Sequence, residues 1–397
     1  MQVTFNNAPD TRSRLGTYVV QRTMDEDVRA FIPPELPPRP GLRMDPLLSL
    51  LAKANRALGR LDGLASVLPD FSLFIYLYLR KEAVLSSQIE GRQSSLSDLL
   101  LFESSEVPGV PIDDIQEVSN YVAAMDYGLD RLKGGFPLSL RLIKEIHGVL
   151  LSKGRGREKE PGEFRHSQNW IGGTRPGNAI YMPPPPDRVM ECMGAMEMFL
   201  HEERPELPVL VKAALVHVQF ESIHPFLDGN GRLGRLLITF LLCASGAMRQ
   251  PILYLSLYLK AHRQQYYDLV QRVRETGDWE AWIEFFLSGV HETADQAAAT
   301  AHEILRLFEE DRRAIETLGR RASSVLRVHQ SLQRSPATSI AMATKKAGLS
   351  TPTVTAALEH MTKLGIVTEA TGRQRDRIFT YTKYLAILNR GTETPVA

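Results

Sequence analysis

The stretch HPFLDGNGRLGR, from His224 to Arg235, combines a histidine, a carboxylate, a glycine-rich turn and two arginines. Gly229, Asn230 and Gly231 are residue types that adopt left-handed backbone conformations at low cost, and consecutive N–H groups in such a turn form a concave anion site. The apolar run from Leu233 to Cys243 follows directly. We therefore expect the turn to open a buried helix whose N-terminal dipole also favours an anion.

The charged residues of this stretch complete a site for a phosphorylated ligand. Arg232 and Arg235 are three apart on one helical face, and each can form paired hydrogen bonds with phosphate oxygens. Asp228 precedes the turn, where its oxygens suit Mg2+. Histidine side chains ordinarily have a pKa of about 6.5, so His224 suits removal of a proton from a hydroxyl at neutral pH. Each residue alone is common on a protein surface, but their combination at this spacing indicates a nucleotide site.

The same stretch matches the motif H-x-F-x-[D/E]-G-N-G-R-x-x-R at every specified position, and the chain therefore resembles Fic-domain proteins. The resemblance implies a mainly α-helical catalytic core that transfers AMP from ATP to a hydroxyl side chain (Ser, Thr or Tyr) of a target protein. It also implies that His224 is the general base and that Asp228 binds Mg2+. The implied nucleotide-binding residues are Asp228, Gly229, Asn230, Gly231, Arg232, Gly234 and Arg235, with Arg235 at the γ-phosphate.

A second motif lies upstream, at the end of an apolar helical pattern over residues 73–92. Ser86 and Glu90 are four apart and hence on one helical face, and Gly91 is a suitable helix stop. By spacing alone this is an ordinary exposed glutamate at a helix end. The string SSQIEG nevertheless resembles the inhibitory motif [S/T]-x-x-x-E-[G/N] of Fic proteins. The resemblance implies that Ser86, Glu90 and Gly91 belong to an inhibitory helix in which Glu90 pairs with Arg235 and blocks the γ-phosphate position.

Between the two motifs, residues 167–171 and 179–182 are predicted to be short strands on either side of a turn-rich segment, with Pro183–Pro186 ending the second. In Fic proteins a hairpin in this position forms a flap that aligns the target by strand addition. Ile171 and Ile180 are the residues expected to hold the target. After the main motif, Tyr267 resembles family residues near the adenine, whereas Tyr266, Trp279 and Trp282 are equally or better explained by core packing.

The composition is that of a folded chain with a formal net charge of +1 over 397 residues, which argues against a globally basic nucleic-acid binder. Two cysteines, Cys192 and Cys243, lack histidines at metal spacing, so neither a disulfide framework nor a zinc site is indicated. The N-terminus has no apolar signal core, and the longest apolar run, Leu236–Ala244, is too short to span a bilayer. We expect a cytoplasmic protein without a membrane segment.

Three segments are expected along the chain. Residues 1–110 would form a helical N-terminal region that starts with a proline-rich extended arm at Phe31–Gly41 and contains the inhibitory helix, with a break at Pro108–Pro111. Residues 111–290 would form the Fic catalytic domain. Residues 291–397 would hold a connector helix at Ala297–Leu318, followed by a winged helix-turn-helix.

The last of these units is predicted from a short helix at Ile340–Ala347, a turn at Gly348–Ser350, a recognition helix at Thr351–Leu364 and two strands within Ile366–Tyr381. Basic residues exceed acidic ones in this region, which leaves DNA binding open. Docking to protein or to a second copy is ranked slightly ahead of it. The candidate DNA-contacting residues are Lys345, Lys346, Lys363, Arg373, Arg375 and Arg377.

Three functions remain open from the sequence. The first is a self-inhibited protein adenylyltransferase that uses ATP and Mg2+, with self-modification and homodimer formation expected. The second is a Fic enzyme that removes AMP or transfers another phosphate-containing group. The third is a DNA-binding regulator with a nucleotide-sensing Fic core, against which His224 argues because a sensor needs no proton acceptor.

Overall fold

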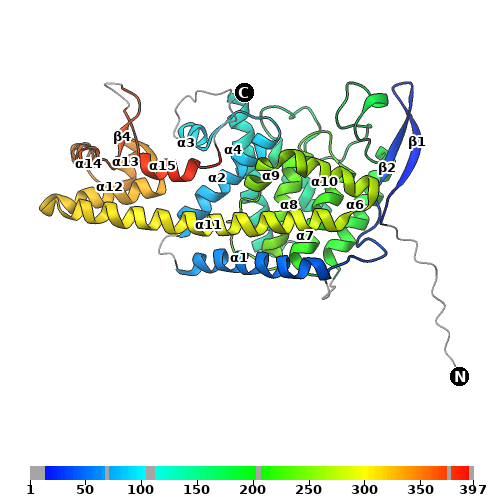
Figure 1. Ribbon diagram of the computed structural model, residues 1–397. Coiled ribbons are helices and arrows are strands. Elements are labelled where there is room, and N and C mark those ends of the chain that lie inside the picture. The colour runs from blue at the N-terminus through cyan, green and yellow to red at the C-terminus, as the bar shows by residue number, and fades with distance from the viewer. Residues whose placement is uncertain (1–13, 68–70, 104–111, 203–206, 373–376, 393–397) are drawn as a thin grey trace. The chain divides into compact units, whose positions relative to one another are not determined.

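The computed structural model describes residues 14–67, 71–103, 112–202, 207–372 and 377–392 (Figure 1). The predicted break at Pro108–Pro111 lies outside them. The chain is mainly helical, as predicted, and divides into two compact units that interleave along the sequence. The first unit comprises Met1–Gly59, Asn120–Arg249 and Tyr258–Glu292, and the second comprises Arg60–Ser119, Gln250–Leu257 and Thr293–Ala397. The first two segments predicted from the sequence are therefore each divided between the units.

The helices and strands follow in one order along the chain. They are β1 (Thr17–Thr23), β2 (Glu26–Ile32), η1 (Asp45–Leu47), α1 (Leu48–Val67), α2 (Phe71–Ile89), α3 (Leu96–Glu103), α4 (Ile112–Lys133), α5 (Leu140–Leu150), η2 (Pro176–Asn178), α6 (Pro186–His201), α7 (Val209–Ile223), α8 (Asn230–Ala244), α9 (Ser256–Ala261), α10 (Arg263–Thr276), α11 (Trp279–Glu316), η3 (Gly319–Arg321), α12 (Ala322–Arg334), β3 (Ala337–Ser339), α13 (Ile340–Ala347), α14 (Thr351–Lys363), β4 (Thr368–Glu369), β5 (Ile378–Thr380) and α15 (Thr382–Asn389).

Helix α7 is the central helix of the first unit. Its residues from Ala213 to Ile223 are all buried, which is the pattern of a helix enclosed on every side. Helices α6, α8 and α10 pack against it, and the indole of Trp282 on α11 donates to Ala214 O at 2.8 Å. Tyr266, Trp279 and Trp282 are buried, so the core-packing interpretation of these aromatic residues is confirmed.

The N-terminal segment adds a hairpin that the sequence analysis did not predict. Strand β1 pairs antiparallel with β2 from Thr17↔Ile32 to Thr23↔Glu26. Met24 and Asp25 form the two-residue turn between them with φ values of 49° and 63°, as a type I′ turn requires. Gln219 on α7 then donates to Pro34 O at 2.8 Å, so the proline-rich arm that follows β2 lies against the helical core.

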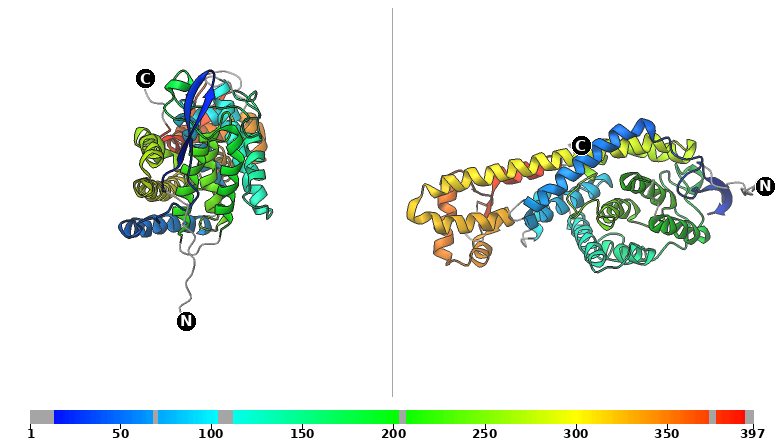
Figure 2. Two further views of the ribbon diagram at one scale, coloured as in Figure 1. Left: turned by 90° about the vertical axis from the view of Figure 1, so that its right-hand side faces the viewer. Right: turned by 90° about the horizontal axis from the view of Figure 1, so that it is seen from below.

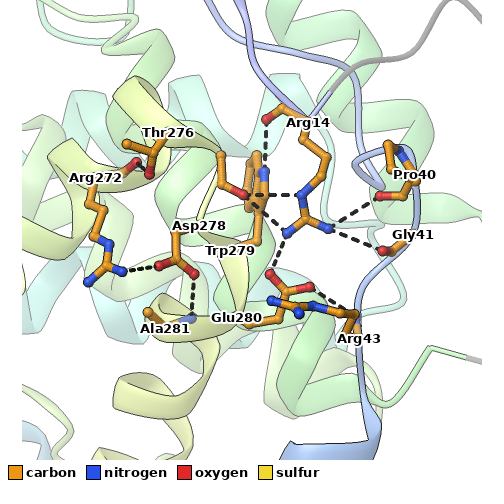
Figure 3. Close-up of polar contacts among 11 residues, drawn as sticks. Arg14, Pro40, Gly41, Arg43, Arg272, Thr276, Asp278, Trp279, Glu280 and Ala281 are labelled. Atoms are coloured by element: carbon orange, nitrogen blue, oxygen red, sulfur yellow. Dashed lines mark hydrogen bonds and ion pairs between the residues drawn. The ribbon is translucent and has the colours of Figure 1, made fainter.

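Arg14 fastens the start of the described chain to the beginning of α11 (Figure 3). Its guanidinium donates to Gly277 O at 3.1 Å and to Gly41 O at 3.1 Å, and it pairs with Glu280. In return, the indole of Trp279 donates to the backbone oxygen of Arg14 at 3.0 Å. Arg14 thereby links the Gly41 end of the arm to the segment where α10 stops and α11 starts.

Within the second unit, the helices and strands predicted between Ile340 and Tyr381 are found. Strands β3, β5 and β4 form a three-stranded antiparallel sheet in that order, beside α12, α13 and α14. The predicted connector helix at Ala297–Leu318 is different, because α11 is one continuous helix from Trp279 to Glu316. No proline or glycine interrupts the chain near residue 297, so nothing ends the helix there.

Two helical glycines of the first unit allow a test of this packing. A Cβ at Gly128 on α4 would lie 2.4 Å from the ring of Phe240 on α8, whereas a Cβ at Gly194 on α6 would meet nothing within 4 Å. Gly128→Ala should therefore lower the free energy of unfolding by about 1–3 kcal/mol through overpacking. Gly194→Ala should raise it by up to about 1 kcal/mol through helix propensity. Urea unfolding of both variants checks this, and equal midpoints would contradict it.

Candidate functional site

His224 terminates α7 in a backbone conformation that a histidine rarely adopts. Its φ and ψ are 49° and 60°, in the left-handed region, and its N–H still donates to Phe220 O at 2.9 Å. Such a residue is stable only where neighbouring contacts hold it in place. The change of direction at His224 also ends the helix and starts the loop that leads to α8.

Two buried arginines bind the end of α7. Arg165 donates from Nε to His224 O at 3.0 Å and from Nη2 to Pro184 O at 2.5 Å. Arg274 donates to Glu221 O at 2.8 Å and to the hydroxyl of Ser222 at 3.1 Å. The last carbonyls of a helix lack partners within it and carry partial negative charge, so cations here satisfy and stabilise them. Burial lowers the pKa of Arg165 to about 10, which leaves it charged at neutral pH.

Asn230 fixes the middle of the loop. Its side-chain oxygen accepts from the N–H of Phe226 at 2.9 Å, and its amide nitrogen donates to Phe226 O at 2.7 Å. Asn169 donates to the same carbonyl at 3.0 Å. Asn230 was predicted to bind phosphate, and its side chain is here occupied in shaping the loop, which leaves its backbone N–H at the start of α8.

His147 on α5 packs against the loop that joins α7 to α8. Its ring stacks on Phe226 with centroids 3.7 Å apart, and its Nδ1 accepts from the N–H of Gly162 at 2.8 Å. Because Nδ1 is an acceptor, the proton is on Nε2, which lies 3.0 Å from Asp228 O and donates to it. Burial lowers the pKa of His147 to about 4, so the ring is neutral at pH 7.

The loop then enters α8 through a left-handed glycine. Gly229 has a φ of 77° and is the N-cap of α8, so Asn230 and Gly231 form the first turn of the helix. One carboxylate oxygen of Asp228 accepts from Gly229 N at 2.5 Å and lies 3.5 Å from Nη2 of Arg232. The predicted glycine turn, helix start and adjacent charges are therefore brought together.

The surroundings of Asp228 are compatible with a divalent cation. The side chain of Asp228 is 38% exposed. Gly156 leaves room beside its second carboxylate oxygen, since a Cβ at that position would lie only 2.8 Å from this oxygen. Over the described part of the chain, no group of three or more His, Cys, Asp or Glu residues could hold a metal ion. Asp228 would be a protein ligand, which fits Mg2+ because that ion keeps several waters and takes further ligands from substrate phosphates.

Arg232 and Arg235 are both only 2% exposed on α8, rather than solvated. Gly234 lies between them, facing α7. A Cβ there would come within 2.6 Å of Glu221 Oε1, and its carbonyl oxygen lies 3.0 Å from Nδ1 of His217. The close approach of the two helices is thus sufficient to require glycine at this position, and a role for Gly234 in nucleotide binding stays a prediction.

The remaining predicted site residues lie on other elements. Tyr267 is 40% exposed on α10, beside Arg263, while Tyr266 is buried and hydrogen-bonded to His217 at 2.9 Å. Ser86 is buried near the end of α2, and Glu90 and Gly91 follow that helix, with Gly91 in the left-handed region as expected for a helix stop. These last three residues belong to the second unit.

The predicted hairpin over residues 167–182 is reduced to a single bridge. Ile171 N donates to Tyr181 O at 2.9 Å, and η2 occupies the connection. The prediction of two strands there was wrong, because only the Ile171–Tyr181 pair forms. Met182 O accepts from Phe31 N of β2 at 2.9 Å. Ile180 is 72% exposed and Ile171 is partly buried, so only Ile180 fully presents its side chain to solvent.

Several residues that shape this site were missed from the sequence. Tyr181 donates to Ser222 O at 2.5 Å and lies against the guanidinium of Arg274, which connects the bridge to the end of α7. None of the missed residues stands within a recognisable local motif, and each acts through a contact distant in sequence. The residues are His147, Arg165, Asn169, Tyr181 and Arg274.

Known protein families and relatives match the part of the chain that contains His224–Arg235. Residues 137–242 match the model of the Fic/DOC family, and residues 48–130 match the Fic/DOC family N-terminal model. Proteins named protein adenylyltransferase Fic are similar over about half of this chain. The protein from Aedes aegypti is 35% identical over 212 residues, 52% of this chain and 39% of its own length. That from Drosophila grimshawi is 32% identical over 210 residues, 52% of this chain and 40% of its own. The chain thus spans about two fifths of these relatives.

Solved structures support the fold. A Fic family protein from Desulfovibrio desulfuricans G20 superposes with a TM-score of 0.58 at 20% identity, over 86% of this chain and 97% of its own. A Fic domain containing signaling protein from Bacteroides thetaiotaomicron gives 0.51 at 18% identity, over 63% of this chain and 95% of its own. The predicted helical fold of the core is therefore confirmed, and it is similar to the fold of these two Fic proteins. No helix in the described ranges has the length and apolar character needed to cross a bilayer.

The two buried histidines of this unit predict a pH dependence of stability. Burial lowers the pKa of His147 and of His217 to about 4, below the 6.5 expected in the unfolded chain. The unfolded state therefore binds more protons between these values, and stability is full above about pH 6.5 and is lost as the pH falls toward 4. At pH 5, His147→Gln should reduce the slope of unfolding free energy against pH by about one proton.

Urea unfolding between pH 4.5 and 7 measures this slope. His302→Gln is the control, because His302 is an exposed residue of the second unit. An unchanged slope in His147→Gln would contradict the assignment of a neutral, buried ring.

Proposed function

We propose that this protein is an adenylyltransferase that moves AMP from ATP to a hydroxyl side chain of a target protein. The observation that carries the proposal is the loop from His224 to Gly229, which joins the end of α7 to the start of α8 and brings Asp228 within 3.5 Å of Arg232. The Fic/DOC match over residues 137–242 and the similarity to proteins named adenylyltransferase support it.

In the proposed reaction, the target hydroxyl oxygen attacks the α-phosphorus of ATP. A new phosphorus–oxygen bond forms, the bond to the bridging oxygen of the β-phosphate breaks, and pyrophosphate leaves. The imidazole of His224 accepts the hydroxyl proton, a contribution of about 10²–10⁴ in rate. The phosphates would lie against the N–H groups at the start of α8, where the helix dipole and Arg232 offset their charge. Bound Mg2+ would supply further charge neutralisation, with Asp228 as its protein ligand.

Arg235 is proposed to contact the γ-phosphate, and Glu90 to inhibit the reaction by pairing with Arg235. The inhibitory assignment is carried by the SSQIEG motif. Two contacts hold the residues of this motif in place within the second unit. Arg92 pairs with Glu117 at 2.8 Å, and Gln88 donates to Ser94 O at 2.7 Å. We also propose that residues 322–388 form a winged helix-turn-helix, since α12, α13, α14 and the β3–β5–β4 sheet follow the order of that fold.

The reaction is tested with a Glu90→Gly protein, ATP and a cell lysate. We expect label from α-phosphate-labelled ATP to enter protein at a rate orders of magnitude above wild type, whereas label from the γ-phosphate stays out. Adding His224→Ala to the Glu90→Gly protein should lower incorporation by about 10²–10⁴. Incorporation of γ-label would indicate phosphate transfer instead, and equal labelling with and without His224 would overturn the general-base assignment.

A further inference from the structure

The SSQIEG motif contacts a segment from a distant part of the sequence. Gln88, two residues before Glu90, is buried in the last turn of α2. Its side-chain nitrogen donates to Ser94 O at 2.7 Å and to Thr392 O at 2.9 Å. The second hydrogen bond joins residues 304 positions apart, both of which belong to the second unit. The position of the motif therefore depends on the residues that follow α15.

Residues 390–392 form a strap after α15, and its first two residues are fixed by parts of the chain distant in sequence. The guanidinium of Arg390 donates to both carboxylate oxygens of Glu303 on α11, at 2.6 and 2.8 Å. Gly391 has a φ of 81°, and a Cβ at this position would lie 2.4 Å from the side chain of Leu257. An ion pair and a close backbone approach thus set the path of the strap.

Thr392 completes the strap at the end of α2. It is fully buried, and its N–H and its hydroxyl both donate to Asn389 O at 2.8 Å. Its own carbonyl oxygen accepts the buried hydrogen bond from Gln88. Because a buried polar group that loses its partner costs free energy, displacement of the strap is unfavourable for the end of α2 as well as for Thr392.

The strap continues directly from the three-stranded sheet and α15. Helix α15 begins two residues after β5 ends, and β5 is the middle strand between β3 and β4. No glycine or proline occurs in residues 378–390, so neither of the residue types that most readily break a helix interrupts this path. Helix α15 packs on α2 and α3, and Tyr381 at its N-cap donates to Asp311 of α11. Figure 1 and the right-hand view of Figure 2 show α15, in red, alongside α11, in yellow.

From these contacts we propose that the strap holds the end of α2 where Glu90 inhibits, and that release of the strap raises AMP transfer. This inference rests on the proposed function and names its regulation. The hydrogen bond between Gln88 and Thr392 forms only while the strap is in place, so its free energy favours the inhibited state over a released one. Displacement of α15 from α2 would therefore relieve inhibition without a contact at the nucleotide site.

Gly391→Ala tests the strap, because the added methyl group meets Leu257 and strains a left-handed position. Gly365→Ala is the matched control in the same unit, since Gly365 has a φ of 69° and a Cβ there meets nothing within 4 Å. With Glu90 intact, we expect transfer of label from α-phosphate-labelled ATP to rise about fivefold in Gly391→Ala, the factor that corresponds to one hydrogen bond of about 1 kcal/mol. Gly365→Ala should transfer at the wild-type rate.

Both substitutions are also made in the Glu90→Gly protein. Because the strap is proposed to act through Glu90, Gly391→Ala should change nothing in that background. A further rise there would show that the substitution acts elsewhere, which overturns the inference, as does a wild-type rate in Gly391→Ala alone. No increase of transfer in Glu90→Gly itself would overturn the proposed inhibition instead.

Arg390→Glu loosens the strap at its other end and replaces Gly391→Ala if that variant melts early. Two carboxylates then face each other, and we expect a two- to fivefold rise, about the range of an exposed ion pair. Adding Glu303→Arg reverses the pair and should restore the wild-type rate, which damage to the fold would not allow. Arg312→Glu on α11 is the control, because Arg312 also pairs with a glutamate and is equally exposed, at 57%. A double variant that stays as active as Arg390→Glu would overturn the inference.

Hydrogen exchange tests the strap independently of AMP transfer. Amides from Leu85 to Gly91 should exchange about fivefold faster in Gly391→Ala and Arg390→Glu than in Gly365→Ala and Arg312→Glu, because local opening of the end of α2 needs less free energy. Equal exchange of these amides in all four variants would overturn the inference. This comparison decides whether the strap holds α2 even where the Glu90→Gly protein transfers no label.

Discussion

The structure of the site depends on the way the end of α7 is held. Four successive backbone groups from Glu221 to His224 reach the helix end, where carbonyls have no partner within the helix. Two arginines from elsewhere in the chain, Arg165 and Arg274, supply donors and positive charge to these carbonyls. With that interaction in place, His224 can remain in a left-handed conformation that would otherwise be costly, and the loop can turn directly into α8.

The loop itself is built to leave its backbone donors available. The side chain of Asn230 binds Phe226, and His147 stacks on the same ring and donates to Asp228 O. These contacts are made by side chains directed into the protein, so the N–H groups at the start of α8 keep their orientation. If the loop binds phosphate as proposed, it needs little reorganisation when the ligand arrives, because its shape is set by buried groups. The glycine residues allow the close backbone approach that the loop requires.

The sequence predicted the local parts of this arrangement and missed the distant ones. The motif from His224 to Arg235, the helix before it and the helix after it are encoded in adjacent residues, and they are found. The hairpin β1–β2 was missed because its turn, Met24–Asp25, lacks the asparagine–glycine type of signal that marks a two-residue turn. The two strands predicted at residues 167–171 and 179–182 are reduced to the Ile171–Tyr181 bridge. The hydrogen bond from Phe31 N to Met182 O joins residues far apart in the sequence, which no local pattern predicts.

Arg165 connects the end of α7 with the segment that leads into α6. Its guanidinium donates to His224 O and also to Pro184 O, which follows shortly after the Ile171–Tyr181 bridge. A random mutagenesis screen for inactive variants would therefore recover changes at Arg165 beside changes at His224, although the arginine lies in the protein interior. Loss of activity on substitution of Arg165 would result from failure to form the loop between α7 and α8. Measuring the amount of folded protein for each inactive variant would distinguish changes that prevent folding of the loop from changes that remove a reacting group.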